Sequence, residues 1–319
     1  MRINSQLLNS QALSVSNVAE RTLRIPLLRP LFLSMLVVAF ATCTGLSARG
    51  QSSGWPTDCG QPNARATPIP VGVSAAPVEA AVFPEAGGTI TVFAASSLSD
   101  AFEEIGSAIN GAHPNITVRF NFAGSQTLVT QLEDGAEADV LATADSSTMD
   151  RAVAGGLVGD HPVRFARNVL VLAVPRGNPA DISSVADLAR PGVKLVVAGP
   201  TVPAGMYARE AICANAASEG PGFLSAVQAN IVSEEEDVRA VLAKLQLGEA
   251  DAGLVYATDV EAASGAVIGI PWPNEQMPSI DYMLNETTSG DIGFARAFMA
   301  FLHEASGQAI LRKHGFLVP

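Results

Sequence analysis

The sequence predicts an α/β fold with mostly parallel sheets in the part of the chain that follows residue 88. Short apolar runs alternate there with segments whose apolar residues recur at helical spacing. The chain has 319 residues, enough for one large or two medium domains with their own cores. Hydrophobic residues make up 48% of it, which excludes a disordered chain.

The first two strands show two different patterns. Residues 89–95 (TITVFAA) form a short apolar run typical of a buried strand, whereas 116–122 alternate apolar residues with Thr117, Arg119 and Asn121. The second strand therefore has one wetter face. Further strands are predicted at 138–142, 169–174, 194–198, 252–256 and 267–270.

Between these strands, apolar residues recur at helical spacing. The first helix follows from Leu98, Phe102, Ile105 and Ile109. Further helices are predicted near 127–134, 148–154, 205–216, 238–247, 292–302 and 308–313.

The amino-terminal segment has the organisation of an export signal. Arginines precede an apolar run at 31–41, which is shorter than the roughly 20 residues that span a bilayer. We therefore predict a signal peptide over 1–46 and export to the periplasm or the outer face of the cell membrane. Cleavage after residues 39–41 (AFA), a small-x-small site, is one alternative. The other is that residues 40–43 (FATC) act as a bacterial lipobox, with Cys43 lipidated as a membrane anchor.

Residues 47–88 have the composition of a linker, rich in Pro, Ala, Gly and Ser without helical or strand period. Cys59 lies in it. A pairing of Cys59 with Cys213 is possible outside the cell, but a buried free Cys213 is the simpler interpretation. No Cys/His cluster has metal-site spacing, so neither a bare metal cation nor a cofactor is expected.

The charge balance limits the partners. Lys and Arg number 19 against 31 Asp and Glu, a formal net charge of -12. Nucleic acid is excluded as a partner, because phosphate binding relies on basic patches. A small anion is not excluded, because neutral donors at helix N-termini can hold one.

Ligands of α/β sheets bind beyond the carboxyl ends of strands, so the strand-to-helix turns are the candidate site. Ser97 precedes Asp100 at capping-box spacing, and a helix cap is the alternative to a ligand role. Ser125 follows Gly124 and offers both N–H and O–H. Each turn alone is a weak signal.

Three later turns add donors. Pro203 suits the first position of a helix and leaves the amide of Ala204 free. Residues 233–239 (SEEEDVR) lead into a helix at Val238, and their acids would repel an anion unless they point away. Tyr256 ends a strand, where its ring either packs internally or sends its O–H into a cleft.

Taken together and in order, these turns resemble the periplasmic molybdate-binding proteins of ABC importers. The resemblance covers about 89–319. Its segments are 91–98 (TVFAASSL), 122–128 (FAGSQTL), Ala138-Asp139, 202–208 (VPAGMYA), 236–239 (EDVR), 253–256 (GLVY) and 313–316 (KHGF).

The resemblance implies a two-lobed periplasmic-binding-protein-like fold with a ligand cleft between the lobes. It implies one lobe over 89–167 plus 273–319 and the other over 168–272. An oxyanion, molybdate or tungstate, would be held without a cation by hydroxyls and amides of five residues. These are Ser97, Ser125, Ala204, Val238 and Tyr256.

The same resemblance implies the partners and one open point. A monomer would deliver the ligand to an ABC permease and its ATPase. Gln126 departs from the family pattern, in which a small hydroxyl residue is common, so the choice between molybdate and tungstate stays open.

The alternatives come from two classes. Within binding proteins they are another oxyanion, such as sulfate or phosphate, or ferric iron, which would need adjacent tyrosines and carboxylates that Tyr256 lacks nearby. The other class is a secreted α/β enzyme. No GxSxG elbow, P-loop or nucleophile–His arrangement is found, so no enzyme is expected.

Overall fold

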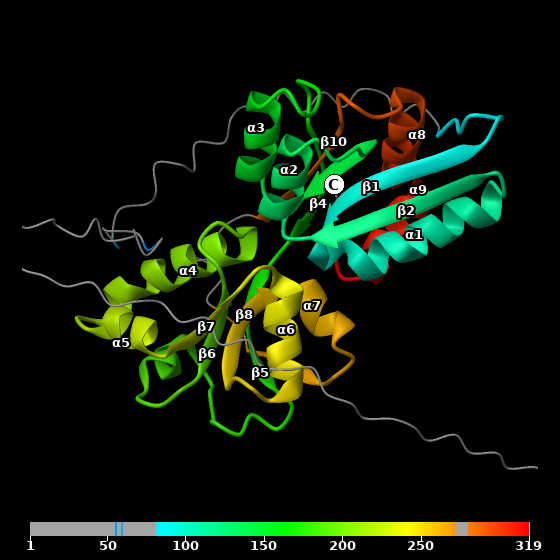
Figure 1. Ribbon diagram of the computed structural model, residues 1–319. Coiled ribbons are helices and arrows are strands. Elements are labelled where there is room, and N and C mark those ends of the chain that lie inside the picture. Colours follow the sequence, from blue (N-terminus) through cyan, green and yellow to red (C-terminus); the bar gives the residue numbers. More distant parts are fainter. Residues whose placement is uncertain (1–54, 56–58, 60–80, 271, 273–279, 319) are drawn as a thin grey trace, which may run out of the picture. The chain divides into compact units, whose positions relative to one another are not determined.

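The computed structural model describes residues 55, 59, 81–270, 272 and 280–318 (Figure 1). These residues form two five-stranded sheets, with strand orders β2-β1-β3-β10-β4 and β7-β6-β8-β5-β9. We call the first sheet with its helices the first lobe, and the second sheet with its helices the second lobe.

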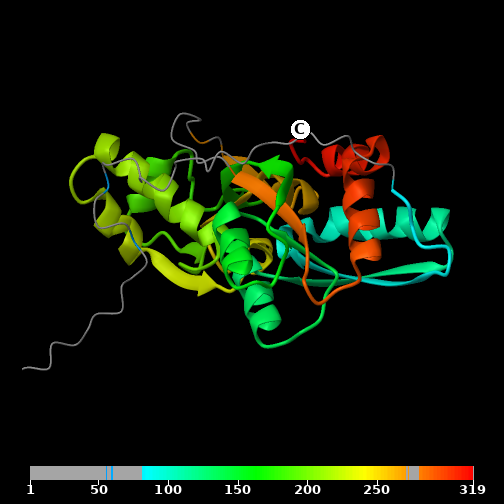
Figure 2. The same cartoon turned by 90° about the horizontal axis from the view of Figure 1, so that it is seen from above.

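The first lobe is a sheet covered on both faces. Its strands are β1 (Gly88–Ala95), β2 (Ile116–Ala123), β3 (Val140–Thr143), β4 (Val163–Asn168) and β10 (Ile280–Glu286). Its helices are η1 (Ser96–Leu98), α1 (Ser99–Ala112), α2 (Ser125–Glu133), α3 (Ser146–Ala154), α8 (Ile292–His303) and α9 (Ala305–Lys313). Both views show α9 beside α1, and the two are in contact (Figures 1 and 2).

Strand β1 explains why both faces are covered. Val92 is buried in the same apolar cluster as Phe102 of α1, whereas its neighbour Phe93 is buried in another with Leu128 of α2. Successive side chains of a strand point to opposite faces of the sheet. The strand is therefore apolar on both faces from Val92 to Ala95, where both faces are buried.

The second lobe repeats this arrangement. Its strands are β5 (Leu170–Pro175), β6 (Leu195–Ala198), β7 (Ile231–Glu235), β8 (Ala252–Tyr256) and β9 (Val267–Ile270). Its helices are η2 (Val185–Ala189), α4 (Pro203–Glu219), α5 (Phe223–Ala229), α6 (Val238–Leu247) and α7 (Ala257–Ala262). Helices α4 and α6 both pack against β6 and β8.

The predicted α/β fold with two sheets is confirmed, and its sheets are mixed in detail. Strands β1, β2 and β3 pair in parallel, as do β6, β7 and β8. Strand β10 runs antiparallel to β3 and β4, and β5 runs antiparallel to β8 and β9. The sequence predictions missed β4, β7, β10, α5 and α7.

The chain leaves the first sheet at Asn168, the last residue of β4, and β5 begins at Leu170. The lobe boundaries at 167/168 and 272/273 remain predictions, as do the signal peptide and the linker range. Residues 81–88 of that range contact the first lobe, where Phe83 is buried beside His113 and the Ala81 amide donates to Glu304 Oε1 at 2.7 Å.

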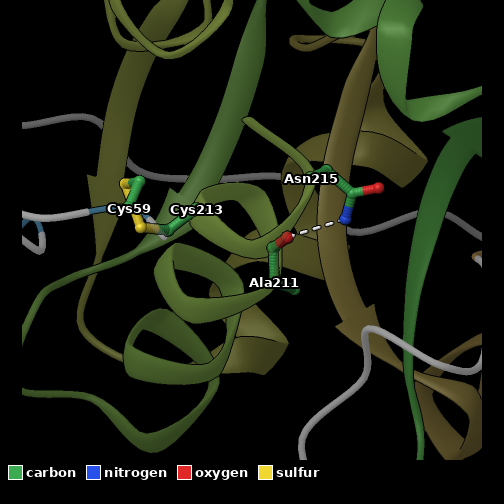
Figure 3. Close-up of a disulfide and its surroundings, with 4 residues drawn as sticks. All are labelled: Cys59, Ala211, Cys213 and Asn215. Atoms are coloured by element: carbon green, nitrogen blue, oxygen red, sulfur yellow. Dashed lines mark hydrogen bonds between the residues drawn. A yellow bond between two sulfur atoms is a disulfide. The ribbon is translucent and has the colours of Figure 1, made fainter. Parts of the chain in front are cut away.

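A disulfide joins Cys59 to Cys213 of α4 (Figure 3). The interpretation of Cys213 as a buried free thiol is therefore wrong. Trp55 lies four residues before Cys59, and Arg209 lies four residues before Cys213. The Arg209 guanidinium is 5.3 Å from the centre of the Trp55 ring, within reach of a cation–π interaction. The disulfide and the cation–π contact thus attach Cys59 and Trp55 to α4 of the second lobe.

Candidate oxyanion site

One pocket lies between the two lobes, where several helices begin. All five predicted site residues line it: Ser97, Ser125, Ala204, Val238 and Tyr256. The pocket encloses an empty volume of about 200 Å³, part of which is open to solvent. These five residues come from five separated segments of the chain and meet at one place.

Three helix N-termini face this pocket. Ser125 is the first residue of α2, Val238 is the first of α6, and Ala204 follows Pro203 at the start of α4. The first four amides of an α-helix have no partner within the helix. The pocket is therefore rich in backbone donors, and the helix dipoles favour an anion there.

The Ser125 hydroxyl has its proton free to donate into the pocket. Its Oγ accepts a hydrogen bond from the Ala144 amide at 3.0 Å, and the side chain is buried. Because a backbone N–H cannot accept, the Ser125 proton remains available for another acceptor. A bound oxyanion would supply that acceptor.

The Ser97 hydroxyl has a different partner from the predicted one. Helix α1 begins at Ser99 without a side-chain cap, so the capping-box interpretation of Ser97 and Asp100 is wrong. Instead, Ser97 Oγ lies 2.8 Å from the hydroxyl of Tyr282 on β10. Ser97 is thus held by the neighbouring strand and lines the pocket from η1.

The Tyr256 hydroxyl is buried and has no hydrogen-bond partner among the described residues. Burial raises the pKa of its phenol well above the ordinary value, so the group stays protonated. A buried hydroxyl without a partner costs free energy. Its position in the pocket lining is explained if a ligand oxygen accepts from it.

The acidic turn before α6 is neutralised by its own surroundings. Glu234 pairs with Arg209, and Glu235 pairs with Lys244. Asp237 lines the pocket, but its Oδ1 accepts from the amides of Arg239 and Ala240 as the N-cap of α6. Three of the four acids thus have partners of their own, and the fourth, Glu236, is exposed to solvent.

Arg239 connects the two lobes beside the pocket. Its Nη2 lies 2.6 Å from Asp100 Oδ2 of the first lobe, and its Nε lies 2.9 Å from Asp259 Oδ1 of its own lobe. Asp259 is fully buried and also accepts from the Tyr256 amide at 3.0 Å. Burial raises the pKa of Asp259 to about 6, while Arg239 opposes that shift.

Gln126 makes a second connection between the lobes. Its Nε2 donates to the Glu236 carbonyl at 2.9 Å, across 110 residues of sequence. Gly124 lies under this contact, and a Cβ on it would be 2.4 Å from Gln126 Nε2 and 2.6 Å from Glu236 O. The residue that departs from the family pattern therefore bridges the lobes at the edge of the pocket.

The sequence predictions missed Asn168, Tyr282, Asp100, Arg239 and Asp259 as neighbours of the site. Arg239 lies in the recognised segment 236–239, but nothing in the sequence indicated its partners. Cys43 lies outside the described residues. Among the described residues, no group of three or more His, Cys, Asp or Glu side chains is placed to hold a metal ion.

The fold and this pocket are those of a two-lobed solute-binding protein. The family model for bacterial extracellular solute-binding proteins matches residues 90–317, and the chain belongs to this family. The family is one of binding proteins that act outside the cell. Within the described residues, no helix is long and apolar enough to cross a membrane.

The chain is similar to individual oxyanion-binding proteins in sequence and in fold. The molybdate-binding protein ModA of Mycobacterium tuberculosis is 40% identical over 234 residues, covering 72% of this chain and 85% of that protein. A periplasmic molybdate-binding protein of Azotobacter vinelandii has the same fold, with a TM-score of 0.63 at 20% identity, covering 72% of this chain and 99% of that one. The sulfate-binding protein SubI of Mycobacterium tuberculosis also has a TM-score of 0.63, at 20% identity, covering 72% and 86%.

Proposed function

We propose that this protein binds molybdate or tungstate outside the cytoplasm and delivers it to an ABC importer. The observation that carries the proposal is the buried Tyr256 hydroxyl, which has no hydrogen-bond partner in the described part of the chain and lines a pocket of hydroxyl and amide donors. The 40% identity to a molybdate-binding protein supports the choice of oxyanion.

The donors are sufficient for tight binding. A hydrogen bond to a charged group contributes about 1.5–3 kcal/mol net. Micromolar affinity requires roughly 8 kcal/mol after the costs of association. Five donors from Ser97, Ser125, Ala204, Val238 and Tyr256 reach that range, because helix N-termini fix most of them beforehand.

Calorimetric titration with molybdate, tungstate, sulfate and phosphate tests the ligand. We expect heat with the first two anions, and heat with sulfate alone would overturn the choice. Sulfate is the second candidate because SubI shares the fold. A larger tetrahedral anion requires a wider spacing of donors than sulfate does.

Two variants test the site. Tyr256→Phe and Ser125→Ala each remove one hydroxyl donor and should weaken molybdate binding about tenfold or more without unfolding the protein. Ser107→Ala is the matched control, because Ser107 is exposed on α1 and its hydroxyl donates to the Glu103 carbonyl of the same helix. Unchanged affinity in both site variants would refute the assignment.

We propose further that the exported chain is anchored at Cys43 and works as a monomer with an ABC permease and its ATPase. The FATC sequence at 40–43 and the linker composition of 47–88 support the anchor. Cys43→Ala should release the protein from membranes. Persistent membrane association of that variant would remove the lipid anchor, and sedimentation of the purified chain tests the monomer.

A further inference from the structure

Asn168, Tyr282 and Ser97 form a chain of hydrogen bonds that ends at the pocket. Asn168 Nδ2 lies 3.2 Å from the Tyr282 hydroxyl, which lies 2.8 Å from Ser97 Oγ. All three side chains are buried. Asn168 ends β4, Tyr282 lies on β10 and Ser97 lies in η1, so three separate elements build the chain.

The side-chain amide of Asn168 determines which group donates in each of these hydrogen bonds. Asn168 Oδ1 lies 2.9 Å from the Val169 backbone N–H, which can only donate. This contact fixes the oxygen and nitrogen of the amide. Asn168 Nδ2 therefore donates, both to the Tyr282 hydroxyl and to Thr258 Oγ1 at 2.9 Å.

The Tyr282 proton then has one destination. Within the described part of the chain, the hydrogen bonds of its hydroxyl are those to Asn168 and Ser97. Asn168 donates to the Tyr282 oxygen and cannot accept the Tyr282 proton there. The Tyr282 O–H therefore donates to Ser97 Oγ. The opposite direction would leave a fully buried phenolic proton without an acceptor, which costs free energy.

The Tyr282 ring has little freedom to change this geometry. It packs edge-on against Phe165, Tyr256 and Phe316, with ring centroids 6.2, 6.0 and 5.3 Å away. The hydroxyl is therefore held where it reaches Ser97. Since Ser97 Oγ accepts from Tyr282 with one of its two lone pairs, its own proton is left for the pocket.

We propose that Asn168 and Tyr282 are positioning residues that direct the Ser97 proton into the pocket and so favour oxyanions without a proton. This inference rests on the proposed function of the site. The bond from the Ala144 amide likewise leaves the Ser125 proton for the pocket. A monohydrogen phosphate must donate its own proton to an acceptor, and two serines that already direct their protons at the ligand suit an oxyanion whose oxygens all accept.

Asn168→Asp tests the direction of the chain. A carboxylate there accepts from Tyr282, so Tyr282 must accept from Ser97, and Ser97 then presents a lone pair to the pocket. The added charge repels every dianion alike. The readout is therefore the ratio of molybdate to phosphate affinity at about pH 8.5, where phosphate is mainly the monohydrogen dianion.

We expect this ratio to fall at least about tenfold in Asn168→Asp. It should fall about fivefold in Tyr282→Phe, which removes the contact that fixes the direction of the Ser97 proton and adds no charge. Thr258→Val is the matched control, because it removes the other acceptor of the same amide. Its ratio should equal that of the wild type.

The outcomes separate the two proposals. A wild-type protein that gives no heat with molybdate refutes the proposed function before any variant is compared. If the wild type takes sulfate instead, the sulfate-to-phosphate ratio tests the same chain. A wild type that binds, with unchanged ratios in both Asn168→Asp and Tyr282→Phe, overturns the positioning role, and Tyr282→Phe alone decides if Asn168→Asp does not fold.

Discussion

Arg239 Nη2 lies 2.6 Å from Asp100 Oδ2 and so joins helix α6 of the second lobe to helix α1 of the first. Asp259 Oδ1 lies 2.9 Å from Nε of the same guanidinium. Asp259 and Arg239 belong to one lobe, so this pair does not depend on the contact between lobes. Asp100 is the part of the arrangement that hinge opening would separate.

Loss of the Asp100 carboxylate should therefore speed ligand release. Asp100 is partly exposed, and ion pairs of this kind contribute about 0.2–1 kcal/mol. We expect Asp100→Asn to raise the dissociation rate of molybdate up to about fivefold and to leave the association rate unchanged. Stopped-flow fluorescence measures both rates. Glu103→Gln, an equal charge loss on the exposed face of α1, should change neither.

A methyl group at Gly124 should block closure of the pocket. The added Cβ would meet Gln126 Nε2 at 2.4 Å and Glu236 O at 2.6 Å, and the second atom belongs to the opposite lobe. Overpacking costs about 1–3 kcal/mol. We expect Gly124→Ala to weaken molybdate binding at least about fivefold in calorimetry.

Gly111→Ala is the control for this substitution, because a Cβ on Gly111 meets nothing within 4 Å. The melting temperature of ligand-free Gly124→Ala should stay close to that of the wild type. Wild-type affinity in Gly124→Ala would show that the lobes close with a different geometry.

The Cys59–Cys213 disulfide should stabilise the protein through the unfolded state. The cysteines are 154 residues apart, and the chain-entropy model gives roughly 5 kcal/mol for a loop of that size. We expect Cys59→Ser plus Cys213→Ser to unfold at lower urea concentration than the oxidised wild type. Under reducing conditions the two proteins should unfold together. A double variant as stable as the oxidised protein would show that the bond constrains little.

The buried carboxyl of Asp259 should give stability a pH dependence. Its pKa is raised to about 6 in the folded protein from an ordinary 3.8. The folded state therefore binds this proton more tightly than the unfolded state. The resulting contribution to the free energy of unfolding is fully present below pH 3.8 and is lost as pH rises through about 6.

Asp259→Asn removes this contribution. The difference in unfolding free energy between wild type and variant should favour the wild type more at about pH 5 than at about pH 7.5. Urea titrations of both proteins at both pH values measure this difference. The contributions of the other titrating groups are common to the two proteins and cancel. A difference that does not change with pH would show that Asp259 keeps one protonation state.

Strands were predicted where apolar residues form a run, as in 252–256, or alternate with polar ones, as in 116–122. The missed strand β7 (Ile231–Glu235) instead carries three partly or fully exposed polar residues at a sheet edge. Strand β4 likewise ends its sheet with Arg164 and Arg167 exposed. Neither of these strands has an apolar run or a regular alternation, so periodicity did not reveal them.

The site was predictable to the extent that it is built from local turns. Ser125, Ala204 and Val238 are at or near the first position of a helix, and a helix start has free amides whatever surrounds it. The Ser97–Tyr282 pair spans 185 residues and depends on β10 lying beside β3 and β4. No local pattern carries that information, and the helix-cap alternative for Ser97 failed for the same reason.

The covalent link between Cys59 and Cys213 imposes an order on maturation. A polypeptide secreted amino terminus first exposes Cys59 to an oxidising compartment well before Cys213 arrives there. The correct bond must wait until α4 has been translocated and the second lobe can fold. Oxidation of this pair thus reports that most of the chain has crossed the membrane, and a host that lacks thiol-oxidising enzymes should accumulate a protein whose amino-terminal segment is open to proteases.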